Sequence, residues 1–148
     1  MGGDRLSPER AAFLREDFAT GFPGHLGARA AEVGPGVWES VVEVRPEHLQ
    51  QDGFVHAGVL ATLADHSAGY AAFTLVPGDR RILTIEFKIN FLRPAVGERL
   101  RCRARVVRPG RTVLVAQSEV WAEADGAPAS VALAQVTLMA VPAERLGG

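Results

Sequence analysis

Thiols are almost absent from this 148-residue chain, which contains a single cysteine, Cys102. No disulfide can form within the chain, and a cysteine-rich metal site is excluded for the same reason. Cys102 falls at an inward position of an alternating strand pattern, which indicates a core residue rather than a nucleophile. A reducing compartment fits this composition best, so we expect a cytoplasmic protein.

An excess of either charge is also lacking, because 16 basic residues against 17 acidic ones give a formal net charge of -1. This balance supplies no attraction to nucleic acid or to a membrane surface. The chain has no Gly-Lys-Ser/Thr phosphate loop, no dinucleotide fingerprint and no Gly-x-Ser-x-Gly nucleophile motif. Residues 1–5 are polar and lack the apolar run of a signal peptide.

Hydrophobic periodicity predicts a single domain of the α+β class over residues 1–148. Residues 1–25 are expected to form a helical extension, in which Ser7 caps a short helix that residues 21–24 stop. Residues 142–148 are expected to be a loose tail. Six strands are predicted, at residues 26–33, 37–44, 82–91, 99–106, 112–123 and 129–141. The tight turns between them make neighbouring strands antiparallel.

Between the second and third strands, residues 57–75 are apolar on every side. A helix without a polar face has to be buried, and one sheet must bury it, so the sheet is expected to wrap around it. A membrane span is disfavoured because Asp65 and His66 lie at its centre.

Asp65 is the one carboxylate in this apolar run. Burying a lone carboxylate costs several kcal/mol unless the group is paired or its pKa shifts. Asp65 is therefore a candidate for chemistry. The alternative is a structural carboxylate bonded to a backbone amide or to Gln50.

The histidines favour structural interpretations. His56 and His66 lie ten residues apart on different turns, so a metal site with Asp65 is disfavoured. His66 is expected in the core or at an interface, and His25 and His48 on surface loops.

Every second residue is arginine at the start of the strand at 99–106. Four like charges at alternate positions are typical of a solvated sheet face, which we favour over phosphate binding. They are Arg99, Arg101, Arg103 and Arg105.

A series of short motifs runs through the middle of the chain. An amide and a glycine precede a His-Ala-Gly triplet, and Leu-Ala-Asp follows inside the predicted helix; these residues are Gln50, Gly53, His56, Ala57, Gly58, Leu63, Ala64 and Asp65. Further on come residues 90–94, Gly97, Leu100, Gly110 and Arg111. With the predicted order of elements, this series resembles the hotdog-fold acyl-CoA thioesterases, in the branch typified by the phenylacetate-pathway thioesterase.

The resemblance implies a hotdog fold, in which an antiparallel sheet of five to six strands wraps around one long central helix, with a short N-terminal helix added here. It also implies hydrolysis of an acyl- or aroyl-CoA to the free acid and CoA, without a metal or organic cofactor. The expected assembly is a homodimer, often paired into a tetramer. One departure is Ala57, where the family has glycine. Its backbone N–H is retained, and its added methyl group is expected either to narrow the site or to shift the approach of the thioester.

Roles follow for individual residues. The Ala57 N–H is the expected donor to the thioester oxygen, Asp65 the general base or the nucleophile, and Gln50 the group that orients water or carbonyl. The substrate-binding set is His56 and Gly58 at the helix start, Asn90 and Leu92 beside the pantetheine, and Arg93 and Arg111 at the phosphates.

Ala57 and Asp65 are eight positions apart on one helix, or about 12 Å along its axis at ~1.5 Å per residue. One thioester carbon cannot contact both. The donor and the carboxylate are therefore expected to come from different subunits of a two-fold dimer.

Two other functions stay open. A hydratase or dehydratase on the same fold typically has Phe-Pro after its histidine, whereas His56 is followed by Ala-Gly. An acyl-CoA sensor usually has a DNA-binding domain attached, and residues 1–25 are too short to form one. The identity of the acyl group is not encoded in any motif.

Overall fold

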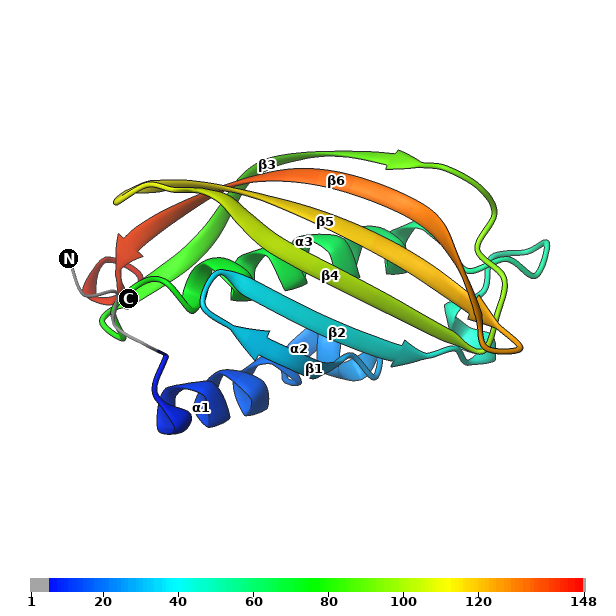
Figure 1. The fold of residues 1–148 in the computed structure, drawn as a ribbon, viewed down its shortest axis with the longest axis horizontal. Helices are drawn as coiled ribbons and strands as arrows, with labels where there is room; N and C mark the ends of the chain where they lie inside the picture. The colour runs from blue at the N-terminus through cyan, green and yellow to red at the C-terminus, as the bar shows by residue number, and fades with distance from the viewer. Residues whose placement is uncertain (1–5, 148) are drawn as a thin grey trace.

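The computed structural model describes residues 6–147 and consists of one antiparallel sheet that curls over a long helix (Figure 1). The helices are α1 (Pro8–Phe18), α2 (Gly21–His25) and α3 (Ala57–Phe73), with the short 3-10 turns η1 (Pro46–His48) and η2 (Ala143–Arg145). The strands are β1 (Arg29–Gly34), β2 (Val37–Glu43), β3 (Arg80–Phe91), β4 (Arg99–Pro109), β5 (Val113–Ala124) and β6 (Ala127–Pro142). Their order in the sheet is β1-β2-β4-β5-β6-β3, and every neighbouring pair is antiparallel. All six predicted strands are confirmed, each end within three residues.

The N-terminal helix begins as predicted, because the Ser7 hydroxyl accepts a 3.0 Å hydrogen bond from the Arg10 N–H. The sequence predicted that residues 21–24 only end this first helix. Gly21 adopts a positive φ of 59°, which turns the backbone, and Pro23 is tolerated within a first helical turn. A second short helix, α2, forms there instead.

The sheet packs its apolar face on α3, which lies in the hollow of the curve (Figure 1). Fully buried side chains of the helix, such as Ala64 and Ala68, meet buried positions of the central strands, such as Leu100 and Val120. Alanine and serine on the helix let the strands approach closely. The predicted α+β class, with a sheet around one helix, is confirmed.

One stripe of α3 is not covered. Gly58, Thr62, Asp65 and Gly69 share one helix face, and each is at least partly exposed. The prediction that this helix is buried on every side is therefore wrong along this stripe. The sheet curls around only part of the cylinder, and α1 and α2 cover part of the remainder.

β3 ends the sheet and carries an irregularity that the sequence pattern did not reveal. The register shifts between Thr84 and Glu86, so that Thr84 lies opposite Leu138 and Phe87 opposite Val136. Strict alternation had placed Thr84 and Phe87 on opposite faces of the sheet. The bulge puts both on the face that α3 occupies.

The C-terminal segment is tied to the fold, since the Ala143 N–H donates a 2.8 Å hydrogen bond to the Asp79 carbonyl. Among the described residues, no helix combines the length and the apolar character that crossing a membrane requires.

Candidate active site

The start of α3 is fixed by a side chain that precedes it. His56 is the N-cap, and its Nδ1 accepts a 2.8 Å hydrogen bond from the Gly58 N–H. A Cβ atom at position 58 would lie 3.0 Å from this nitrogen, so glycine leaves room for the ring. Within residues 6–147, the Ala57 N–H has no hydrogen-bond acceptor, as expected for the first residue of a helix. This N–H is a free donor at the positive end of the helix dipole.

Gln50 begins the loop that leads into this helix. Its side-chain oxygen accepts hydrogen bonds from the backbone N–H groups of Asp52 and Phe54. The oxygen is therefore occupied by the loop itself. In the part of the chain that the structure describes, the amide NH2 of Gln50 has no acceptor, so it is a second available donor.

Both donors open into a cleft of about 550 Å³ at the beginning of α3. Most of its lining is apolar, with exposed Phe91 at one wall and Arg93 as its charged residue. The lining residues are Gln50, Gln51, Phe54, Val55, His56, Ala57, Leu60, Phe91, Leu92, Arg93, Pro94 and Ala95. Five residues expected at the site from the sequence thus meet in one place: Gln50, His56, Ala57, Leu92 and Arg93.

Asp65 lies two turns further along α3, outside this cleft. It is partly exposed on the uncovered stripe rather than sealed in the core. Its Oδ1 accepts a 2.7 Å hydrogen bond from the Thr84 hydroxyl of β3. The bulge in β3 turns this hydroxyl toward the helix. The expected backbone amide or Gln50 partner is therefore replaced by a threonine that sequence reasoning did not identify.

Three residues expected at the site lie elsewhere. The Gly58 N–H is taken by His56 and is not available to a ligand. Asn90 pairs with Leu133 and lines a separate hollow of about 660 Å³ on the outer face of the sheet, away from α3. Arg111 is exposed in the β4–β5 turn, about 30 Å from the cleft end of β4 at ~3.3 Å per strand residue. Within one protomer, the structure does not bring these groups together with the cleft.

The remaining histidines are structural, but one is not where we expected it. His66 packs on Phe18 with ring centroids 4.4 Å apart, and its Nε2 contacts the Phe18 carbonyl at 2.9 Å. Burial lowers the pKa of His66. His48, expected on a surface loop, is fully buried, and desolvation lowers its pKa as well. Cys102 is a core residue as predicted, and burial raises the pKa of its thiol to about 12.

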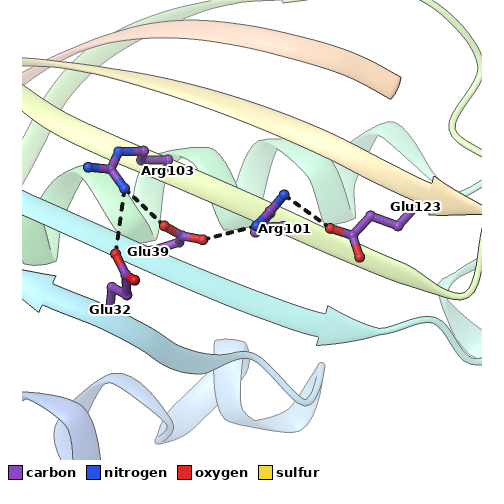
Figure 2. A network of polar contacts seen from close by, with 5 residues as sticks. All are labelled: Glu32, Glu39, Arg101, Arg103 and Glu123. Atoms are coloured by element: carbon purple, nitrogen blue, oxygen red, sulfur yellow. Dashed lines mark hydrogen bonds and ion pairs between the residues drawn. The ribbon is translucent and has the colours of Figure 1, made fainter. Parts of the chain in front are cut away.

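Three arginines of the row, Arg99, Arg101 and Arg103, contact carboxylates of neighbouring strands, as Figure 2 shows for the last two. Arg105 instead donates a hydrogen bond to the Gln117 side chain. Arg103 contacts Glu39 at 3.0 Å, and Arg101 contacts Glu39 at 3.5 Å and Glu123 at 3.3 Å. Charges paired within the sheet face are not available to phosphates. The structural interpretation of this row is therefore supported.

Comparison with known proteins agrees with this architecture. Residues 52–129 match the family described as the thioesterase superfamily. The fold is shared with a thioesterase family protein from Silicibacter pomeroyi, at 43% identity and a TM-score of 0.86 over 89% of this chain and 98% of that one. A conserved protein from Pseudomonas aeruginosa is 31% identical, with a TM-score of 0.78 over 86% of this chain and 98% of the other.

A curated relative from Halobacterium salinarum carries the name "Putative esterase". It is 40% identical over 84 residues, which are 55% of this chain and 55% of that protein. The chain thus spans little more than half the length of this relative.

Proposed function

Since the chain belongs to the thioesterase superfamily, we propose that it hydrolyses the thioester of an acyl- or aroyl-CoA to the free acid and CoA. We further assign it to the branch typified by the phenylacetate-pathway thioesterase, because Gln50, His56, Ala57 and Asp65 keep that branch's spacing. No metal or organic cofactor takes part. Cytoplasmic location belongs to the same proposal, supported by the single buried thiol of Cys102.

The cleft at the start of α3 supplies the hydrogen-bond donors that polarise the thioester carbonyl. Hydrolysis places negative charge on the thioester oxygen as the tetrahedral intermediate forms. The Ala57 N–H and the Gln50 amide NH2 are two donors on residues that line this cleft. Together they suit that oxygen, and the apolar walls strengthen both hydrogen bonds by excluding water.

Asp65 supplies the general base or the nucleophile, and its position is the observation that carries the proposal. A carboxylate on the open stripe of α3 is accessible, yet it is held by Thr84 in one orientation. It acts either as general base for a water or as nucleophile that forms an anhydride. Single-turnover hydrolysis in ¹⁸O water identifies the anhydride route when water opens the anhydride at the Asp65 carbonyl carbon, because label then enters the Asp65 carboxylate and the product acid keeps an oxygen from Asp65.

The donors of one cleft and the carboxylate that acts there belong to different protomers. Ala57 and Asp65 lie on the same straight helix, about 12 Å apart along its axis, so a second α3 must bring its Asp65 to the first cleft. The edge of the sheet supports such an assembly. β3 is 12 residues long with its outer edge unpaired by the rest of residues 6–147, and Ile85 and Phe91 on it are 53% and 48% exposed. A second copy paired along β3 would cover them and bring the open stripes together.

CoA then lies along the seam from the cleft, with Leu92 and His56 beside the pantetheine and Arg93 at the phosphates. Asn90 and Arg111 lie outside the cleft of their own protomer, so phosphate recognition rests first on Arg93. Pairing of two dimers into a tetramer is part of the same proposal.

The replacement Asp65→Asn tests this function. Acyl-CoA turnover, followed as thiol release across aromatic, short and medium acyl groups, is expected to fall by at least ~10³-fold. Binding of an unreactive acyl-CoA analogue should remain within a few-fold of the native value. Asp79→Asn, in an exposed turn, is the matched control. Unchanged turnover in the Asp65→Asn protein would remove this carboxylate from the mechanism, and ligand binding without turnover in the native protein would favour an acyl-CoA sensor.

A further inference from the structure

The cleft loop, residues 49–56, is held at its base by a buried histidine. This loop carries Gln50 and His56 and leads directly into Ala57, so its conformation fixes both donors of the cleft. Its two ends pair through a bridge between Leu49 and Val55. The residue immediately before it, His48, is fully buried at the end of η1.

His48 makes contacts on three sides. Its Nδ1 accepts a 3.0 Å hydrogen bond from the Arg45 N–H, and its Nε2 lies 3.4 Å from the Arg45 guanidinium. Its own carbonyl accepts a 2.8 Å hydrogen bond from the His56 N–H. The imidazole thus holds residue 48 in η1, and the backbone carbonyl of the same residue holds the far end of the cleft loop.

These contacts define the protonation state of the ring. Because Nδ1 accepts from the Arg45 backbone, the proton of the neutral ring is on Nε2. A second proton would have to occupy Nδ1, directly against the Arg45 N–H. It would also place a cation 3.4 Å from the Arg45 guanidinium.

The charged groups around the ring oppose a positive charge on balance. Desolvation is the largest effect and lowers the pKa of His48, and Arg45 lowers it further. Glu47 raises it by less, and its carboxylate is engaged by Arg45 Nε at 3.2 Å. From α2, His25 contributes only its carbonyl, which accepts from Arg45 at 2.8 Å.

We propose that His48 is a positioning residue of the thioesterase cleft, whose neutral imidazole locks the cleft loop and whose protonation releases it. The inference rests on the proposed function for its effect on catalysis. It assigns the loop a built-in acid sensitivity that does not involve the catalytic carboxylate. His48 does not touch the substrate and acts through Gln50, His56 and Ala57.

Two substitutions separate the parts of this role. His48→Asn keeps an acceptor oxygen near the position of Nδ1 and cannot take up a proton. His48→Gln places its amide nearer the position of Nε2 and loses the acceptor for Arg45. The asparagine variant is expected to keep kcat/KM within about threefold of native at neutral pH and to lose part of the decline in acid. The glutamine variant is expected to lower kcat/KM about tenfold at every pH, the effect of one lost hydrogen bond.

Amide hydrogen exchange tests the lock without any substrate. The N–H groups of Gln50, Val55 and His56 are hydrogen-bonded in the locked loop. Their protection factors, corrected for intrinsic exchange, should fall about tenfold or more between about pH 7.5 and about pH 5 in the native protein. They should stay constant in the asparagine variant, and in the glutamine variant they should be low at both pH values.

Loop protection that follows the same pH course in native and asparagine proteins would overturn the proposal. So would native loop protection and native kcat/KM in a glutamine variant. A loss confined to the global unfolding transition, with unchanged kcat/KM in the folded protein, would also overturn it, because it indicates a merely structural residue. If no thioester is hydrolysed, the proposed function fails. Hydrogen exchange still tests whether the neutral His48 ring holds the cleft loop.

Discussion

The Thr84 hydroxyl donates a 2.7 Å hydrogen bond to Oδ1 of Asp65, and this bond joins the edge strand β3 to the uncovered stripe of α3. It leaves Oδ2 of the carboxylate for a water or a thioester carbon. The bond exists because a bulge after Thr84 places this side chain on the helix face of the sheet. Thr84 therefore orients the carboxylate to which we assign the chemistry.

Removing this hydroxyl should slow catalysis without unfolding the protein. Thr84→Val keeps the shape of the side chain but leaves Oδ1 without its donor. Hydrogen bonds to charged groups contribute roughly 1.5–3 kcal/mol, so kcat is expected to fall about 10- to 100-fold with KM little changed. Thr84→Ser keeps the hydroxyl and should stay within a few-fold of native. Equal steady-state rates for the valine and serine variants would contradict an orienting role.

A mixing experiment tests whether the site is shared between protomers. Ala57→Pro removes only the N–H, because proline is tolerated at the first position of a helix and His56 already has the extended conformation (φ -61°, ψ 137°) that proline requires before it. We expect Ala57→Pro and Asp65→Asn proteins each to be inactive. After subunit exchange at equal concentrations, half of the dimers are mixed, and each has one intact site, so about a quarter of native activity should return.

The control for this experiment is the double variant that carries both changes on one chain, mixed with native protein. If donor and carboxylate acted within a single protomer, mixing the two single variants would restore nothing. Sedimentation at the assay concentration should show a dimer or a tetramer, and no monomer, in every case.

Stability should decline in mild acid because of the buried imidazole of His66. Burial lowers its pKa below 6.5 in the folded state. Between that lowered pKa and 6.5, the unfolded chain binds more protons than the folded one, so the free energy of unfolding falls as the pH falls. Each such histidine contributes at most about 1.4 kcal/mol per pH unit in this window. Chemical denaturation from pH 8 to pH 5 measures the slope, which His66→Asn should reduce.

The docking of α1 should affect stability alone. The Tyr70 hydroxyl donates a 2.7 Å hydrogen bond to the Asp17 carboxylate, which ties α1 to α3, and burial raises the pKa of Tyr70. Tyr70→Phe is expected to lower the free energy of unfolding by about 1–2 kcal/mol. Thiol release at saturating acyl-CoA should not change in the folded variant. A large loss of kcat would indicate that α1 also shapes the cleft.

Much of this protein follows from local sequence. Period-two alternation from Arg99 to Val106 requires a strand with one apolar face, and an apolar run bounded by His56 and Pro77 requires a helix inside a sheet. The Asp125-Gly126 hairpin was predicted because both residues favour positive φ, and both adopt it, at 52° and 75°. The spacing of Gln50, His56 and Ala57 was sufficient to place them together, because all three lie within eight residues of one another.

Only the tertiary structure decided which faces remain open and which partners distant residues find. The bulge in β3 reverses the direction of Thr84, and no local pattern indicates a one-residue shift in register. The fraction of α3 that stays uncovered depends on the curvature of the whole sheet, so Asp65 looked buried in sequence and is partly exposed in space. His48 is a polar residue that was expected on a surface loop, but the folded chain buries it completely. Burial and pairing are sums over contacts between distant segments, and those contacts exist only once the chain has folded.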